Sequence, residues 1–269
     1  MRKSVTGLLV AAAVASTSVN AQVFDGGLPT GYVCTATTVA SACGTSVASG
    51  NLTLAPGGGS RFGWISSSGG SLRNPLGIAG TTTGTTLTSA NFTTTAGQSL
   101  SFAFNYITSD GAGFSDYAFV RLLSATAPPI VLFTARTIVV GNTVPGFGLP
   151  GIAPGVTLSP PSTPIIPGAV TFPPGGIGGC FSSGCGFTGW INASYVVPTD
   201  ATYQLEFNVF NFSDTAFQSG LAFDFTTGAG GTPIAPGDPG VIPEPSTYAL
   251  MATGLIGLVG LSRRRRNTV

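Results

Sequence analysis

Two stretches of this chain alternate strictly between apolar and polar residues, and this period of two limits the possible folds more than any other feature. Leu100–Tyr106 alternates Leu, Phe, Phe and Tyr with small or polar residues, and Tyr203–Val209 alternates Tyr, Leu, Phe and Val with Gln, Glu and Asn. Side chains of a strand point alternately to the two faces of a sheet, so both stretches predict half-buried antiparallel strands. No amphipathic helical pattern of useful length occurs between residues 22 and 241.

Further strands are expected where β-branched and aromatic residues lie between turn residues. They are Asn51–Leu54, Arg61–Ile65, Thr85–Thr95, Asp116–Leu123, Ile130–Val140, Thr188–Val197 and Leu221–Thr226. The 40 Gly and 20 Pro supply turns, and the 18 Phe and 6 Tyr argue against disorder. The pattern predicts an all-β domain over residues 22–227, an antiparallel β-sandwich with a jelly-roll-like arrangement.

Two segments rich in Pro and Gly interrupt the strands. Residues 141–179 form a stretch too long for an ordinary loop, and we expect an ordered excursion attached to the sandwich by Phe147, Ile165, Ile166 and Phe172. Division of the domain into two lobes at this segment is the alternative. Residues 228–241 are predicted to be a linker between the domain and the C-terminal segment.

Charge is scarce in this chain and is concentrated at its ends. Charged residues make up 7% of the sequence, against about 25% in an ordinary soluble domain. Between residues 22 and 241 the basic residues are Arg61, Arg73, Arg121 and Arg136, and the acidic ones are Asp25, Asp110, Asp116, Asp200, Glu206, Asp214, Asp224 and Asp238. Nucleic-acid binding is not expected, because it needs a basic surface that displaces counterions from phosphate.

The N-terminus has the three parts of a secretory signal peptide. Arg2 and Lys3 form a positive region, residues 7–15 are apolar, and Ala21 supplies the small residue at the cleavage site. Residues 1–21 are therefore predicted to be removed by signal peptidase between Ala21 and Gln22. An N-terminal membrane anchor is the alternative, but the apolar run is short for one.

The C-terminus, residues 242–269, also has three parts in order. Pro243, Glu244 and Pro245 come first, residues 248–261 are almost wholly apolar, and Arg263, Arg264, Arg265 and Arg266 follow. A helix over 248–261 would be roughly 21 Å long, which is short against a hydrocarbon core of about 30 Å. The arginines are expected to stay on the cytoplasmic side of the inner membrane, because charge is costly at the bilayer centre. A permanent tail anchor is the alternative.

This order of Pro-Glu-Pro triplet, short transmembrane helix and arginine cluster resembles the PEP-CTERM sorting signal. The resemblance implies a Gram-negative bacterium, often one that makes exopolysaccharide. It also implies an exosortase that removes the helix and the arginines. Three phrases of the body, at residues 108–117, 141–148 and 214–224, resemble a family of uncharacterised PEP-CTERM proteins without an established activity. The third phrase is similar to the penultimate stretch of jelly-roll modules in bacterial surface proteins.

Four cysteines in an exported chain predict disulfides. Of the three possible pairings, local pairing of Cys34 with Cys43 and of Cys180 with Cys185 is favoured, because each pair brackets a short turn-rich stretch. Zinc binding is a weak alternative, since the chain has no His and the compartment is expected to be oxidising.

The lack of His also limits the kinds of catalytic site that the chain could form. A Ser-His-Asp or Cys-His arrangement is impossible, and no spacing singles out a catalytic carboxylate pair. Asp25, Asp224 and, with less support, Asp214 are candidate ligands of a structural calcium ion, because first and last strands of a jelly roll are often neighbours. The alternative is that these aspartates accept backbone N–H groups in turns.

Four aromatic residues and two arginines also lie in the expected strands. Trp64, Trp190, Tyr117 and Tyr195 are either a sugar-stacking platform or, as is more common in a sandwich, part of the core. Arg121 and Arg136 are expected on the solvent face or paired with an aspartate.

The sequence thus predicts an exported, non-catalytic surface or extracellular-matrix protein, tethered to the inner membrane as a precursor and then found in the outer envelope or outside the cell. Its expected partners are signal peptidase, an exosortase and extracellular polysaccharide. The alternative function is that of a carbohydrate-binding jelly-roll module stabilised by calcium.

Overall fold

The computed structural model describes residues 23–39, 42–70 and 74–225, all of which belong to one compact unit. The strands are β1 (Val33–Thr35), β2 (Cys43–Ser46), β3 (Phe62–Ser66), β4 (Thr81–Thr88), β5 (Phe92–Thr94), β6 (Ser99–Thr108), β7 (Tyr117–Ser124), β8 (Ile130–Arg136), β9 (Val156–Ser159), β10 (Ile166–Pro167), β11 (Val170–Phe172), β12 (Ile177–Gly179), β13 (Gly186–Phe187), β14 (Ile191–Val196), β15 (Ala201–Phe212) and β16 (Ser219–Phe225). The helices of these residues are three short 3-10 turns, η2 (Ser67–Gly69), η3 (Ala112–Phe114) and η4 (Pro173–Gly175).

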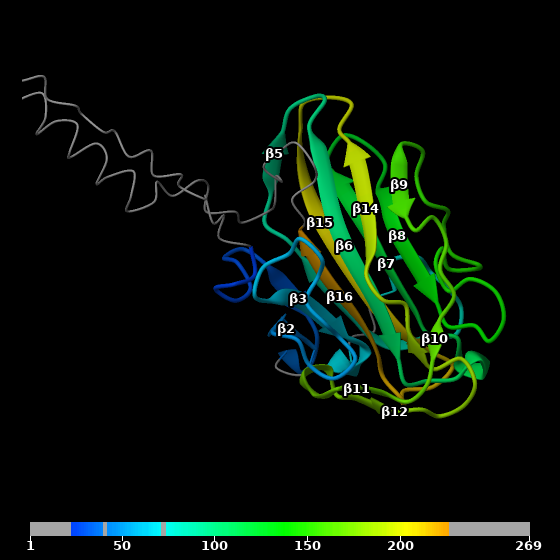
Figure 1. Cartoon of the computed structure of the whole chain (residues 1–269). Helices are drawn as coiled ribbons and strands as arrows, with labels where there is room; N and C mark the ends of the chain where they lie inside the picture. Colours follow the sequence, from blue (N-terminus) through cyan, green and yellow to red (C-terminus); the bar gives the residue numbers. More distant parts are fainter. Residues whose placement is uncertain (1–22, 40–41, 71–73, 226–269) are drawn as a thin grey trace, which may run out of the picture. The chain divides into compact units, whose positions relative to one another are not determined.

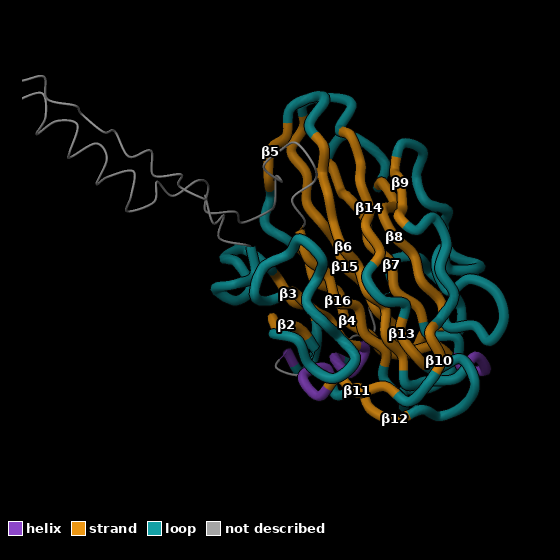
Figure 2. Tube along the Cα trace, in the orientation of Figure 1, coloured by secondary structure: helices purple, strands orange, loops and turns teal. Residues whose placement is uncertain are grey.

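Most of the strands form two antiparallel sheets that pack face to face, with most of the loops at the ends and along the sides (Figures 1 and 2). β11 and β12 form a separate two-stranded sheet. The first sheet has the order β1-β4-β15-β7-β8, with β5 also paired to β15. The second has the order β10-β13-β6-β16-β3-β2, with β14 paired to both β6 and β9. The predicted all-β, antiparallel architecture is therefore confirmed for the described residues.

The long strands pass back and forth between the two sheets as the chain proceeds, except that β7 and β8 are consecutive in the first sheet. β3, β6, β14 and β16 lie in the second sheet, whereas β4, β7, β8 and β15 lie in the first. The last long strand, β16, pairs with β3, the first long strand, and Leu221 of β16 lies opposite Ile65 of β3. Neighbouring first and last strands are a feature of jelly rolls, and the jelly-roll-like arrangement itself stays a prediction.

The core between the sheets consists of the apolar positions that alternate along β6 and β15. Leu205, Phe207 and Val209 of β15 are fully buried there, and the rings of Phe207 and Phe223 stack with centroids 3.9 Å apart across the two sheets. The alternation of apolar and polar residues therefore predicted correctly which side chains of β6 and β15 point into the core.

The outward faces of both sheets are also covered, which the alternation did not predict. On the second sheet, Phe172 and Ile177 of the β11–β12 hairpin pack on Phe62, Trp64 and neighbouring residues. On the first sheet, Tyr117, Phe119 and Phe210 form a third cluster, against which partly buried apolar residues pack. The central residues of β15 are consequently buried on both faces rather than half-buried.

The Pro/Gly-rich segment 141–179 is ordered, and it contributes β9, β10, β11 and β12. Phe172 is buried and Ile165 packs against the main core, as predicted for the attachment of this segment. Phe147 and Ile166 are exposed, so the prediction was wrong for these two residues.

Three predicted strand boundaries were wrong as well. Asn51–Leu54 is not a strand, and its pairing is limited to a single bridge between Ser49 and Leu52. Thr85–Thr95 is divided into β4 and β5, and the strand predicted over Ile130–Val140 ends at Arg136. Each error lies where the chain leaves a sheet, which local residue preference does not determine.

The predicted signal peptide (1–21), linker (228–241) and sorting signal (242–269), including the apolar stretch 248–261, lie outside the described residues. Among the residues that the structure does describe, there is no helix with the length and hydrophobicity needed to cross a bilayer.

Candidate functional site

The residues predicted to direct export and sorting fall outside the part of the chain that the structure describes. They are Ala21 and Gln22 at the signal cleavage site, Pro243, Glu244 and Pro245 in the sorting motif, and Arg263, Arg264, Arg265 and Arg266 after the apolar stretch. The described sites are therefore those of the folded domain.

Both disulfides have the local pairing that the sequence predicts. Cys34 is joined to Cys43 with Cα atoms 6.3 Å apart, and Cys180 is joined to Cys185 with Cα atoms 5.5 Å apart. The first disulfide links β1 of the first sheet to β2 of the second. The second closes a short exposed loop, residues 180–185, between β12 and β13.

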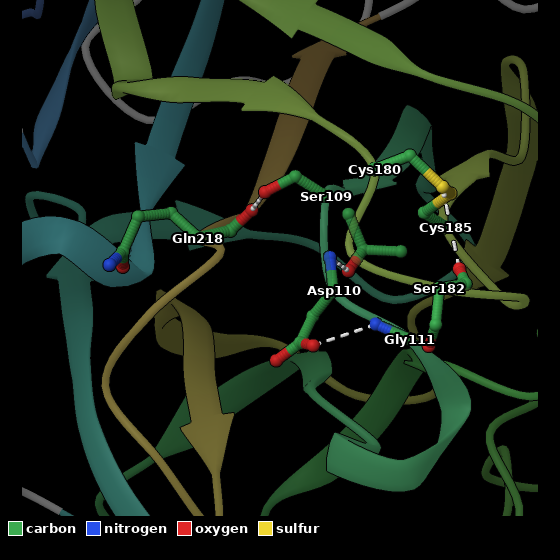
Figure 3. Close-up of a disulfide and its surroundings, with 8 residues drawn as sticks. Ser109, Asp110, Gly111, Cys180, Ser182, Cys185 and Gln218 are labelled. Carbon is green, nitrogen blue, oxygen red and sulfur yellow. Dashed lines mark hydrogen bonds between the residues drawn. A yellow bond between two sulfur atoms is a disulfide. The ribbon is translucent and has the colours of Figure 1, made fainter.

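The disulfide loop 180–185 is hydrogen-bonded to residues 109–112, which follow β6 (Figure 3). The amide of Phe181 donates to the carbonyl of Ser109, and the amide of Ala112 donates to the carbonyl of Ser183, both at 2.9 Å. A Cβ atom at Gly111 would collide with the Oγ of Ser182. Glycine therefore allows the two segments to approach closely.

Asp110, which lies beneath this loop, is fully buried and only partly satisfied (Figure 3). Its Oδ1 accepts a hydrogen bond from the amide of Gly111 at 2.7 Å, while its buried Oδ2 has no hydrogen-bond partner. Burial, and to a lesser extent the nearby charge of Asp214, raise the pKa of Asp110 to about 7, although the hydrogen bond from Gly111 opposes the shift.

Asp116 is a second buried carboxyl on the same side of the domain. It accepts hydrogen bonds from the Oγ of Ser219 at 2.6 Å and from the amide of Phe212 at 2.9 Å. Burial holds the pKa of Asp116 well above its usual range, although these two hydrogen bonds oppose the shift. Both Asp110 and Asp116 are fully buried, so neither carboxyl is presented to a substrate for acid–base chemistry.

The sequence identifies Asp110 and Asp116 as two of the few acidic residues of the domain, but it does not predict their burial. Asp110 and Asp116 follow β6 and precede β7, and both strands are central in their sheets. The mixture of Asp, Ser and Gly in residues 109–116 is typical of an exposed turn. The contacts that bury it come from distant parts of the chain, namely the loop 180–185, Phe212 of β15 and Ser219 of β16.

The candidate calcium ligands are only partly brought together. Asp25 and Asp224 lie at one loop, residues 58–61: Asp25 accepts from the amides of Ser60 and Arg61 at 2.7 and 3.1 Å, and Asp224 accepts from the amide of Gly59 at 3.3 Å. Burial, and to a lesser extent the charge of Asp25, raise the pKa of Asp224 to about 7.

Asp214 lies elsewhere, because it precedes the start of β16 whereas Asp224 lies at the end of that strand. Its charge acts on Asp110 and Asp116, and its Oδ1 accepts from the amide of Ala216 in its own turn. Among the residues described, no group of three or more His, Cys, Asp or Glu is suitably placed to hold a metal ion. A calcium ion held by Asp25 and Asp224 stays a prediction, and hydrogen bonding to backbone amides accounts for the positions of all three aspartates.

The four aromatic residues considered for a sugar-stacking platform belong to the packed interior, which is the role expected to be more common in a sandwich. Trp64, Tyr117 and Tyr195 are buried, and they lie in three different apolar clusters. Trp190 packs against the cluster of Trp64 and donates its indole N–H to the carbonyl of Thr53 at 3.1 Å.

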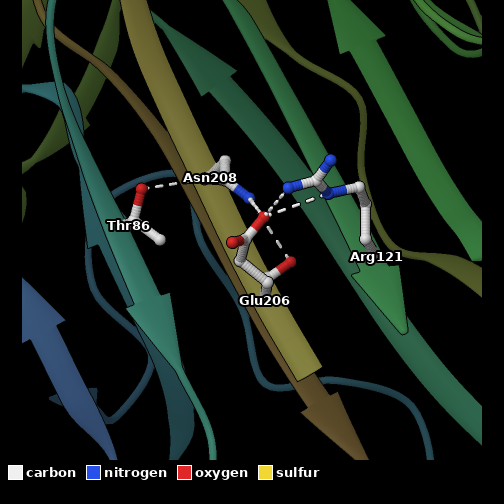
Figure 4. Close-up of polar contacts among 4 residues, drawn as sticks. All are labelled: Thr86, Arg121, Glu206 and Asn208. Atoms are coloured by element: carbon white, nitrogen blue, oxygen red, sulfur yellow. Dashed lines mark hydrogen bonds and ion pairs between the residues drawn. The ribbon is translucent and has the colours of Figure 1, made fainter. Parts of the chain in front are cut away.

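Arg121 forms an ion pair on the outward face of the first sheet (Figure 4). Its Nε and Nη2 donate to Oε1 of Glu206 at 3.0 and 2.5 Å. Asn208 donates to the same oxygen at 3.1 Å and accepts from the Oγ1 of Thr86 at 2.8 Å. The partner of Arg121 is thus a glutamate on the neighbouring strand rather than the predicted aspartate.

Arg136 is buried, contrary to the predicted solvent-facing or aspartate-paired position. Its guanidinium lies 4.7 Å from the ring centroid of Phe212 and 4.8 Å from that of Phe147, and its Nε donates to the carbonyl of Ser115. Cation–π contacts therefore replace an ion pair at this position.

Comparison of the whole domain with solved structures shows only a slight likeness. The K1 cleaved adhesin domain of Lys-gingipain from Porphyromonas gingivalis W83 is 12% identical, with a TM-score of 0.34 over 76% of this chain and 95% of that domain. The K3 cleaved adhesin domain of the same protein is 13% identical, with a TM-score of 0.34 over 77% of this chain and all of that domain. A likeness at this level carries no argument about function. No curated protein matches the chain in sequence.

Comparison with protein families gives a specific result for the C-terminal segment. The PEP-CTERM protein-sorting motif matches residues 241–266. This range contains the Pro-Glu-Pro triplet, the apolar stretch and the four arginines from which the sequence predicts the signal. The chain therefore carries a PEP-CTERM sorting motif at residues 241–266.

Proposed function

We propose that this chain is an exported, non-catalytic protein of the bacterial surface or extracellular matrix, released from the inner membrane by an exosortase and associated with exopolysaccharide. Signal peptidase removes residues 1–21 during export. The apolar stretch 248–261 then holds the precursor in the inner membrane while the domain folds outside the cytoplasm. The exosortase acts at Pro243, Glu244 and Pro245 and removes the apolar stretch with the arginines that follow it.

The observation that carries this proposal is the match of residues 241–266 to the sorting motif. The two disulfides support the same route, because disulfides persist in oxidising compartments such as the periplasm and the cell surface. A non-catalytic role is supported by the lack of His in the sequence and by the burial of Asp110 and Asp116.

Intact-mass analysis of the protein recovered from the cell envelope and from the medium tests the proposal. The expected mature protein begins at Gln22, lacks Arg263–Arg266 and does not react with thiol reagents until it is reduced. Recovery of a wild-type protein that still carries the arginines would contradict processing by an exosortase. Free thiols in the native protein would contradict folding outside the cytoplasm.

A second candidate function is that of a carbohydrate-binding jelly-roll module stabilised by calcium. The strand order of the two sheets supports the fold, and the meeting of Asp25 and Asp224 at the loop 58–61 favours the calcium site. If calcium binds there, the melting temperature should be higher in millimolar calcium than in chelator, and Asp25→Asn should remove the difference. An unchanged melting temperature would eliminate the calcium site.

A further inference from the structure

Three phenylalanines from three separate loops meet at the surface beside the disulfide loop. Phe114 ends η3, Phe181 belongs to the disulfide loop 180–185, and Phe217 belongs to the loop between β15 and β16. The ring centroid of Phe181 lies 5.4 Å from that of Phe114 and 4.8 Å from that of Phe217. We call these three residues the aromatic rim.

Two of the three phenylalanines of the aromatic rim are much more exposed than the phenylalanines of the core. The exposed fractions of Phe181 and Phe217 are 48% and 40%, whereas most phenylalanines of the domain are buried. The rim lies apart from the three apolar clusters of the interior.

The backbone at the aromatic rim is held in a conformation that costs free energy. Phe217 has a φ of 49°, in the left-handed region that bulky residues rarely adopt. Its loop is fixed by hydrogen bonds from Gln218 Nε2 to the carbonyl of Thr215 and from Thr82 Oγ1 to the carbonyl of Asp214. Backbone strain of this kind is concentrated at binding sites, where surrounding structure holds it in place.

The polar groups around the aromatic rim indicate the chemistry of its ligand. Residues 109–116, 180–185 and 213–218 contain no Lys or Arg, and they contain exposed hydroxyl groups at Ser182, Ser183 and Thr215. Asp110, Asp116 and Asp214 lie in the same loops. A polyanion is disfavoured by this combination, because these loops supply no exposed cation to pair with it. The guanidinium of Arg136 contacts the carbonyl of Ser115 but is buried. A neutral ligand with an apolar face and hydroxyl groups fits.

The size of the aromatic rim indicates a small ligand surface rather than a protein interface. Two half-exposed rings and the edge of a third present roughly 200–300 Å² of aromatic surface. A stable protein–protein interface buries about 800 Å² on each partner. The C–H bonds on one face of a sugar ring carry partial positive charge and stack on the negative face of an aromatic ring. One or two sugar rings would cover the aromatic rim.

We propose that the aromatic rim, Phe114, Phe181 and Phe217, is a binding site for neutral saccharide chains. This inference deepens the second candidate function and rests on it for the class of ligand. The site lies beside the start of β16, whereas the chain continues toward the sorting motif from the other end of that strand, about 20 Å away. The aromatic rim is therefore on the end of the domain that is remote from the exit of the chain.

Affinity electrophoresis of the protein recovered from its producing cells tests this site. The native gels contain neutral glucan, mannan or galactan, and a matched gel contains a polyuronate as the anionic comparison. We expect retardation of the wild-type protein in at least one neutral polymer and none in the polyuronate. Phe181→Ala should weaken the retardation about three- to tenfold, and Phe181→Trp should preserve it.

Phe147→Ala is the matched control, because Phe147 is also an exposed phenylalanine (44%) and lies outside the aromatic rim. It should migrate as the wild type in every gel. Retardation that is equal in wild type and Phe181→Ala would overturn this site while leaving carbohydrate binding intact. Absence of retardation in all neutral polymers would overturn both. Dimerisation that depends on concentration and is lost in Phe181→Ala would assign the aromatic rim to a second copy of the chain instead.

Discussion

The buried carboxyls of this domain make its stability depend on pH at the level of single residues. The pKa values of Asp110 and Asp224 are raised to about 7, and that of Asp116 is also raised, mainly because burial disfavours the charged form. A folded-state pKa above the unfolded value means that the folded protein binds the proton more tightly. The resulting stability is fully present below about pH 4 and is lost as the pH rises through about 7.

We therefore expect a lower melting temperature at pH 8 than at pH 5. Asp110→Asn should reduce this difference, because the amide oxygen can still accept the hydrogen bond from Gly111 while the buried charge is removed. The control is Asp200→Asn, at an exposed aspartate that accepts from the amide of Ala96, and it should leave the difference unchanged. Thermal melts at several pH values measure both effects. A melting temperature that rises from pH 5 to pH 8 would contradict the assignment.

The ion pair between Arg121 and Glu206 gives a second prediction at this scale. Glu206 is buried, and Arg121 supplies two of its hydrogen bonds. Arg121→Met should lower the free energy of unfolding by about 1–3 kcal/mol, because a buried carboxylate loses charged donors. Replacing both residues by Met should recover part of this loss, since no buried charge remains. Denaturant unfolding checks both variants, and equal stability of Arg121→Met and wild type would show that the pair contributes nothing.

Among the elements, β3 and β16 approach each other so closely that glycine is required at one position. A Cβ atom at Gly63 of β3 would meet the ring of Phe223 on β16. Gly63→Ala should cost about 1–3 kcal/mol of unfolding free energy, because the core must shift to admit the methyl group. The control is Gly178→Ala in β12, where nothing lies within 4 Å of the added Cβ atom. Denaturant unfolding should separate the two variants, and similar losses in both would argue against crowding at Gly63.

The sequence predicted the elements whose side chains alternate and missed those that are defined by their partners. β6 and β15 were correctly located, because their apolar positions repeat every second residue over a long stretch. β1, β2 and β13 are two to four residues long and each pairs with a longer strand, while the two-residue β10 pairs in turn with β13. Pairing of this kind brings together residues far apart in the chain, as Val33 and Thr88 show, and no local pattern reports it.

The candidate sites also divide into those that the sequence predicts and those that it does not. The cysteine pairing and the sorting motif could be predicted, because each depends on residues close together in the sequence. The aromatic rim could not, because Phe114, Phe181 and Phe217 come from three loops whose positions depend on the whole sandwich. The large aromatic residues that composition suggested for a platform instead fill space between layers, which is their usual role in a sandwich.

At the scale of the whole molecule, the domain covers both outward faces of its sheets and leaves its polar chemistry to the loops. The β11–β12 hairpin covers one face and the cluster of Tyr117, Phe119 and Phe210 packs on the other. A protein that uses so little surface charge relies on backbone pairing and aromatic packing for its stability. In the proposed function, the PEP-CTERM motif determines where such a domain is released, independently of how the domain folds.

This independence gives the last prediction. Replacing Pro243 and Pro245 by Ala should leave the domain folded but prevent removal of the C-terminal segment, because the change affects the sorting motif alone. The variant should accumulate in the inner membrane with its arginines intact, and intact-mass analysis of membrane and medium fractions measures this. The control replaces Pro236 and Pro239 in the preceding linker, which alters two prolines of the same region outside the motif, and it should be processed as the wild type. Equal release of both variants into the medium would show that the processing enzyme does not recognise the Pro-Glu-Pro triplet.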